Sequence, residues 1–305
     1  MSNLSTTGAW SFHPLVEAFP PTILPNIAYW NVTNGTWDYQ VQVSWPLNWT
    51  SKDVNSTVET LYVLDGNALA QSATEALRKR RPVDFNQPDT IVVSIGYPNL
   101  QPDSPYSDRR YHDYQMPVCD DCPPQQDAPD VPSGGKAFIN FLDTILRPWV
   151  HNYFPNAEFH RDGLYGHSFG GLFVLYALLS HPHVFDVFLS ASPYLIWNNE
   201  YFFTQNSPLY SAVTSTGTTK PALQLTYGAL EQAPKKRRTE TPEAYETRRA
   251  FLASLKTEDL VIRLYDKIKD SPLLRDVELQ EYPFSYHAAV GGNALADGID
   301  YFLDW

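Results

Sequence analysis

The chain has 305 residues, 43% of them hydrophobic, which is enough for one large α/β domain with a substantial core. Its 34 acidic and 22 basic residues give a formal net charge of −12, which argues against binding to nucleic acid or an anionic membrane and favours a cationic or neutral ligand. No apolar run approaches the roughly 20 residues that cross a bilayer, and no basic and apolar leader is recognisable, so we expect a soluble, cytoplasmic protein.

The first third of the chain predicts an arm, two strands and a helix before a third strand. Residues 1–35 are rich in Pro, Asn and Thr and are expected to lie as an N-terminal arm over the domain. Residues 37–46 alternate polar and apolar side chains, which predicts an antiparallel strand. The apolar run 60–67 predicts a buried central strand that ends in a loop, and residues 68–80 predict a helix. Residues 89–97 predict another buried strand.

A long segment without periodicity follows, at residues 98–135. Loops of this length inside a compact domain are uncommon and are usually functional, so we expect an active-site loop. It contains Cys119 and Cys122, spaced C-x-x-C in an acidic, proline-rich stretch, which we interpret as structural or incidental thiols. Residues 136–154 carry a helical apolar stripe that Pro148 crosses.

The central motif is at residues 166–170, which read Gly-His-Ser-Phe-Gly and match G-x-S-x-G. In serine hydrolases this pattern forms a strained strand-to-helix turn, the nucleophile elbow, which exposes the serine hydroxyl above a sheet. A short apolar run at residues 164–165 predicts the end of a buried strand, and residues 171–179 predict a buried helix. The motif therefore has the setting that an elbow requires; the alternative is a glycine turn with an idle serine.

Further strands and helices follow the motif. Residues 184–193, 221–227 and 277–282 predict strands. Residues 241–269 form a charged amphipathic segment that begins with Thr-Pro, a helix-start signal, and residues 292–305 predict a closing helix.

Strands and helices alternate along the chain, and no internal repeat is recognisable. This pattern predicts an α/β fold with a mostly parallel central sheet, covered by helices on both faces and with an antiparallel start. We expect a single α/β-hydrolase domain over residues 1–305.

A serine hydroxyl needs a histidine base, and the histidine is in turn oriented by a carboxylate. In α/β hydrolases the chain order is Ser, acid, His, so the base should follow Ser168. His181 and His183 lie at the far end of the elbow helix, which leaves His287, just beyond the last strand, as the predicted base. Glu231 fits best as the acid, and a Ser–His dyad without a firm acid partner is the alternative.

The oxyanion hole requires two backbone N–H groups aimed at the developing charge. One is expected from Phe169, directly after the serine. The other is expected from the turn after the early central strand, at Gly66 or Asn67. Asp65, which is acidic, is expected to brace this turn instead.

Several blocks together resemble the esterase D-type esterase family, from about residue 35 to the end of the chain. They are Leu64-Asp65-Gly66-Asn67, Ile95-Gly96-Tyr97-Pro98, Arg109 to Asp113, residues 166–171, and Ser192-Pro193-Tyr194-Leu195-Ile196-Trp197. The most similar branch contains the siderophore esterases that open ferric enterobactin, salmochelin and bacillibactin. Fungal esterases that cleave ferric triacetylfusarinine C-type siderophores are similar too.

The resemblance implies hydrolysis of ester bonds in a ferric siderophore, such as triacetylfusarinine C, and release of iron inside the cell. The serine and histidine of the family map onto Ser168 and His287, and the acid maps less cleanly onto Glu231. No set of protein metal ligands is recognisable, so we expect no cofactor, and any iron would arrive with the substrate.

The resemblance also places Arg109, Arg110 and Trp197 near the ligand. A bulky substrate would fit an aromatic-lined cleft, whose candidate walls are Tyr97, Tyr106, Tyr111, Tyr114 and Trp197. The alternatives are a general carboxylesterase, an S-formylglutathione-type thioesterase, and a non-catalytic ligand binder on the same scaffold.

Overall fold

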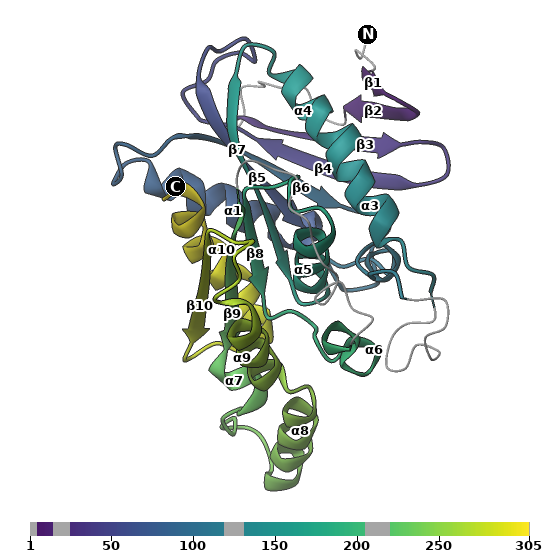
Figure 1. Cartoon of the computed structure of the whole chain (residues 1–305), viewed down its shortest axis with the longest axis vertical. Coiled ribbons are helices and arrows are strands. Elements are labelled where there is room, and N and C mark those ends of the chain that lie inside the picture. Colours follow the sequence, from purple (N-terminus) through teal and green to yellow (C-terminus); the bar gives the residue numbers. More distant parts are fainter. Residues whose placement is uncertain (1–4, 15–24, 119–130, 205–219, 305) are drawn as a thin grey trace.

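One ten-stranded sheet organises the molecule (Figure 1). The computed structural model describes residues 5–14, 25–118, 131–204 and 220–304. The strands lie in the order β1-β2-β3-β4-β6-β5-β7-β8-β9-β10. Their bounds are β1 Ser5–Thr7, β2 Trp10–Pro14, β3 Ile27–Thr33, β4 Asp38–Ser44, β5 Thr57–Leu64, β6 Asp89–Gly96, β7 Glu158–His167, β8 Val187–Ala191, β9 Ala222–Gly228 and β10 Asp276–Tyr282. In this order, each strand from β1 to β6 is antiparallel to the next, and each strand from β6 to β10 is parallel to the next.

Helices cover both faces of the sheet. The helices are α1 Gly66–Arg80, α2 Arg110–Asp113, α3 Gly135–Phe141, α4 Arg147–Tyr153, α5 Phe169–Ser180, α6 Trp197–Glu200, α7 Ala229–Gln232, α8 Pro242–Ser254, α9 Thr257–Ile268 and α10 His287–Leu303. Side chains of α1 and α10 form one buried cluster with the sheet, and side chains of α3, α4, α5 and α9 form the other. None of the described helices is both long and apolar enough to span a membrane.

The N-terminal region differs from the predicted arm. Strands β1, β2 and β3 extend the sheet beyond β4 within residues 1–35. Alternate residues of β3 are buried, and its Trp30 packs edge-on against Trp149 of α4 at 5.0 Å between ring centroids. The arm was predicted from the overall Pro, Asn and Thr content of residues 1–35, and this content does not reveal the alternation within β3.

The described residues of the long segment 98–135 include helical elements. The segment contains α2, and α3 begins at its last residue. Cys119 and Cys122 lie outside the described residues, so their predicted role stays a prediction. The helix predicted over 136–154 is present as α3 and α4 joined by a π-helical stretch, Leu142–Leu146. Pro148 has no N–H to donate to the preceding turn, and the wider π turn accommodates that loss.

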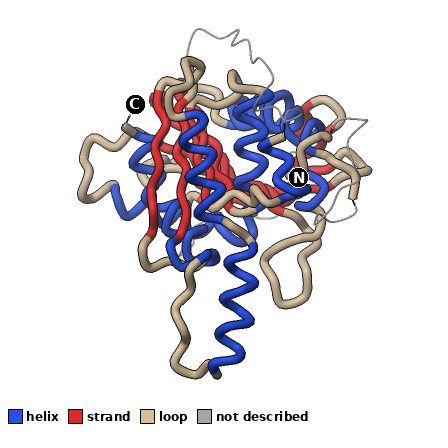
Figure 2. Tube along the Cα trace, turned by 60° about the horizontal axis from the view of Figure 1, so that its bottom comes forward, coloured by secondary structure: helices blue, strands red, loops and turns tan. Residues whose placement is uncertain are grey.

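The C-terminal third differs in two places. The segment predicted over 241–269 is two helices, α8 and α9, which separate at Lys256, whose φ is 51°. Helix α8 has no buried side chain and projects from the body of the molecule (Figure 2). The closing helix begins at His287, five residues earlier than predicted.

Candidate active site

The elbow has the geometry that its sequence predicts. β7 ends at His167, and Ser168 adopts φ 60° and ψ −116° before α5 begins. This positive φ is strained for a residue with a side chain, and such strain clusters at functional sites. A Cβ on Gly166 would lie 2.3 Å from the Gly170 carbonyl oxygen, so only glycine permits the tight crossing of strand and helix.

Glu231 and His287 come from two successive strand–helix units, and their side chains are in contact. Glu231 lies in α7 directly after β9, and His287 is the first residue of α10, directly after β10. The His287 Nδ1 is 2.5 Å from Glu231 Oε2. With Nδ1 engaged by the carboxylate, the imidazole has its Nε2 available for a second partner. Both residues lie in helices, where the sequence predicted loops.

The Glu231 carboxylate is 2% exposed and fully hydrogen-bonded. Its other oxygen, Oε1, accepts hydrogen bonds from the Ser192 hydroxyl at 2.5 Å and from the Gly228 amide at 2.7 Å. These donors compensate the burial of a negative charge. Ser192 was not predicted as a site residue; its place at the end of the predicted strand that forms β8 is the sequence signal that could have identified it.

His287 lies against the elbow. Its ring centroid is 4.5 Å from that of His167, the residue before Ser168. Burial, and then the charges of His287 and Arg110, hold the pKa of His167 well below its usual value. The His167 imidazole is therefore neutral, and the space for it depends on Gly291, where a Cβ would lie 3.1 Å from the ring.

The first turn of α1 forms the other side of the site. β5 and β7 are parallel neighbours, so the starts of α1 and α5 lie at the same edge of the sheet. Gly66 is packed on β6, where a Cβ would lie 2.9 Å from the Ser94 carbonyl carbon. Asn67 accepts a 2.7 Å hydrogen bond from the Tyr97 amide. The first N–H groups of a helix have no intrahelical acceptor, so Gly66, Asn67 and Phe169 offer donors at this edge.

A buried ion pair fixes this turn. Asp65 has φ 53° and accepts two 2.9 Å hydrogen bonds from the Arg110 guanidinium. Burial acts to lower the pKa of Arg110, but the charge and hydrogen bonds of Asp65 outweigh burial and raise it. The Asp65 amide also donates to the Tyr114 hydroxyl at 3.1 Å. Asp65 thus braces the turn, as we expected from its acidic side chain.

Several side chains predicted to contact a substrate are buried instead. Arg110, Tyr97 and Trp197 are 8%, 2% and 1% exposed, and Tyr114 is buried as well. Arg110 is engaged by Asp65, and the Tyr97 hydroxyl donates to Asp113 at 2.9 Å. These four side chains are thus mostly withdrawn from the surface, and their contact with a substrate stays a prediction.

The remaining candidates are partly exposed. Arg109 stacks on Trp37, with its guanidinium carbon 4.8 Å from the ring centroid. Tyr106 and Tyr111 are partly exposed, and Tyr111 lies edge-on to Phe169 at 5.4 Å. These three side chains therefore stay candidates for substrate contact.

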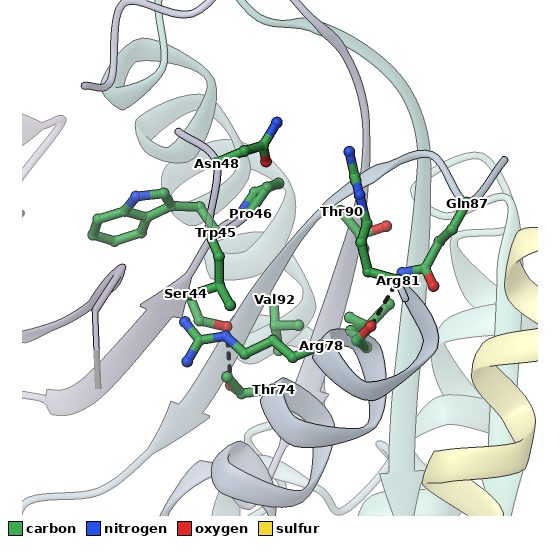
Figure 3. A pocket seen from close by; sticks show the side chains of 12 residues that line it. Ser44, Trp45, Pro46, Asn48, Thr74, Arg78, Arg81, Gln87, Thr90 and Val92 are labelled. Carbon is green, nitrogen blue, oxygen red and sulfur yellow. Dashed lines mark hydrogen bonds between the residues drawn. The ribbon is translucent and has the colours of Figure 1, made fainter. Parts of the chain in front are cut away.

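A separate cavity of about 260 Å³ lies at the opposite end of α1 (Figure 3). It is lined by the end of β4, the last turns of α1 and the start of β6, and Ser44 and Thr74 hydrogen-bond each other in its wall at 2.9 Å. No predicted site residue lines this cavity. Within the described ranges, no group of three or more His, Cys, Asp and Glu side chains could hold a metal ion.

Comparison with known proteins identifies related chains. A family model described as "Putative esterase" matches residues 33–256. The siderophore enterobactin esterase of Emericella nidulans is 36% identical over 299 residues, covering 95% of this chain and 96% of that protein. The siderophore triacetylfusarinine C esterase of Aspergillus fumigatus is 30% identical over 288 residues, covering 93% and 96%.

A solved structure is similar over the whole fold. The siderophore hydrolase EstA from Aspergillus nidulans aligns with a TM-score of 0.85 and 35% identity, covering 96% of this chain and 99% of that one. The predicted fold class, an α/β-hydrolase fold with helices on both faces of a mostly parallel sheet, is thereby confirmed.

Proposed function

Because this chain belongs to the "Putative esterase" family and is an ester hydrolase, we propose that it cleaves siderophore esters with Ser168, His287 and Glu231 as its catalytic triad. The observation that carries the assignment is the buried Glu231 carboxylate, hydrogen-bonded to a histidine that lies against the elbow. Nucleophile, acid and base follow one another along the chain as Ser168, Glu231 and His287, which is the order that α/β hydrolases use.

The chemistry follows from this arrangement. The Ser168 hydroxyl attacks the ester carbonyl carbon while His287 Nε2 takes its proton. Glu231 holds the imidazole in place and stabilises its positive charge. Amides of Phe169 and of Gly66 or Asn67 donate to the oxyanion. When the C–O bond breaks, His287 gives its proton to the leaving alcohol, and water then releases the acid from the serine by the same route.

The substrate class rests on the relatives. The names of the two fungal relatives specify enterobactin and triacetylfusarinine C, two siderophores whose ester bonds are opened. A ferric siderophore would bring its iron as cargo, which hydrolysis releases. Iron release in the cytoplasm is a prediction from the sequence, and cell fractionation with an antibody to the chain would test it.

The deciding experiment incubates the purified protein with ferric catecholate and ferric fusarinine-type siderophores and identifies the products by mass spectrometry. We expect Ser168→Ala and His287→Ala each to lower kcat by about 10⁴-fold or more, with siderophore binding retained in the serine variant. Ser180→Ala, at the exposed end of the same helix, should match the wild type. Undiminished hydrolysis by Ser168→Ala would refute the assignment.

Two further measurements separate the alternatives. Turnover of a small p-nitrophenyl ester without turnover of siderophores would indicate a general carboxylesterase or a thioesterase. Failure of a fluorophosphonate probe to label Ser168 would indicate a non-catalytic binder.

A further inference from the structure

Residues 233–254 carry a positive charge in an otherwise acidic chain. Lys235, Lys236, Arg237 and Arg238 are consecutive, and all four are exposed. Six basic and only three acidic side chains lie in this segment, whereas the whole chain has a formal net charge of −12. The overall charge therefore conceals a local basic surface.

This basic run lies beside the catalytic residues. It begins four residues after Glu231, in the connection between α7 and α8. The Lys235 carbonyl accepts a 3.2 Å hydrogen bond from the Tyr286 hydroxyl, and Tyr286 directly precedes His287. The Lys235 ammonium lies 5.4 Å from the ring centroid of Phe284, which is 81% exposed. The run thus borders the site next to the base and the acid.

Hydrogen bonds from α8 hold the segment in place. The Tyr245 hydroxyl donates to the Pro234 carbonyl at 3.1 Å, and Arg248 donates to the Lys235 carbonyl at 2.9 Å. Both bonds engage backbone oxygens, so the basic side chains of the run are left out of these contacts. Helix α8, which buries no side chain of its own, serves here as a support for the basic run.

Most of the positive charge of the run is not paired with a carboxylate side chain. Glu240, two residues after the run, accepts hydrogen bonds of 2.7 and 2.8 Å from the Arg248 side chain and one of 3.0 Å from the Arg237 amide. Among the described residues, no carboxylate forms an ion pair with Lys235, Arg237 or Arg238. Exposed like charges at the border of a site attract oppositely charged ligands over about 8 Å at physiological salt.

We propose that residues 235–238 form a basic rim that selects ester substrates with a net negative charge. This inference deepens the proposed function, because it assigns a charge preference to the same site. A ferric complex of three catecholate dianions carries three negative charges, whereas a ferric complex of three hydroxamates is neutral. The rim therefore favours the catecholate type and overrides the preference for cationic or neutral ligands that the net charge suggested.

The test uses the double variant Arg237→Glu/Arg238→Glu, which leaves the backbone bonds of Lys235 and Pro234 intact. Its substrates are mono-p-nitrophenyl glutarate, which is anionic, and p-nitrophenyl butyrate, a neutral ester of similar size. We expect KM for the glutarate to rise by about 3- to 10-fold with kcat nearly unchanged, and both constants for the butyrate to stay the same. For the wild type, kcat/KM for the glutarate should fall as salt rises from about 20 to about 500 mM, and the variant should lose this dependence.

A control variant, Lys52→Glu/Lys79→Glu, changes the net charge equally at two exposed positions away from the rim. An unchanged preference for the glutarate in the rim variant, or the same loss in the control, would overturn the inference. The ferric catecholate and hydroxamate esters should show a larger shift of the same sign. If no siderophore is cleaved but the two p-nitrophenyl esters behave as expected, the inference about the basic rim is supported and the proposed siderophore substrate is refuted.

Discussion

At the scale of single residues, the surroundings of Glu231 explain how a buried carboxylate can work beside a histidine. Its two oxygens receive three hydrogen bonds, from Ser192, Gly228 and His287. Each donor stabilises the ionised form, which must stay negative while the imidazole gains its proton. The sequence alone pointed to Glu231 by its place after a strand, but only the fold shows which donors hold it.

Ser192→Ala should test this support. The substitution removes one hydrogen bond to a buried charge, worth about 1.5–3 kcal/mol, so we expect kcat to fall by about 10- to 100-fold with KM little changed. An undiminished kcat in Ser192→Ala would show that the Ser192 hydroxyl does not support the Glu231 carboxylate.

His167 should make stability depend on pH. Its folded pKa lies below the unfolded value of about 6.5, chiefly because it is buried. Below pH ~6.5 the unfolded chain therefore binds a proton that the folded chain does not, and the contribution to stability present above that pH is lost as pH falls. We expect His167→Gln to show a smaller loss of unfolding free energy between about pH 6.5 and 5, measured by urea denaturation.

The comparison needs a control because carboxylates also titrate in this range. His183→Gln, at an exposed position beyond α5, should follow the wild-type curve. Parallel curves for the wild type and His167→Gln would contradict the argument.

At the scale of elements, the site is built from the first turns of four helices. Gly66 begins α1, Phe169 begins α5, α7 contains Glu231, and His287 begins α10. Sequence patterns predicted α1, α5 and α10, each with a start that is too late, because Gly, Asn and His are weak helix formers, and they did not predict α7. Tertiary contacts outweigh that propensity here, such as the packing of Gly66 on β6.

Two glycine substitutions should have opposite effects. In Gly66→Ala the new methyl group meets the backbone of β6 at 2.9 Å, so we expect a loss of about 1–3 kcal/mol of stability and a reduced kcat. In Gly292→Ala, inside α10, the methyl group meets nothing within 4 Å, so we expect a gain of about 0.5–1 kcal/mol. Thermal and chemical denaturation measure the stability of both variants. An unchanged stability of Gly66→Ala would show that α1 can shift away from β6 at no cost.

At the scale of the whole molecule, the sequence predicted the alternating architecture and the catalytic serine, histidine and acid candidates, because each has a local pattern. It did not predict which aromatic and basic side chains are buried. Arg110 looked like a ligand contact, but its partner Asp65 is 45 positions away in the chain, and no local pattern reveals such a pair. Likewise, the net charge of −12 did not reveal the basic run at residues 235–238, because a sum over the chain carries no information on where the charges lie.

Strand β10 ends the sheet on one side, and it pairs with β9 alone among the described strands. Its exposed side chains include Glu278 and Glu281. If the β10 strands of two copies paired edge to edge, these carboxylates would bring like charges close together, which opposes association through the sheet edge. We expect Glu278→Thr/Glu281→Thr to self-associate at lower protein concentration than the wild type in sedimentation velocity, and identical profiles would show that these carboxylates do not protect solubility.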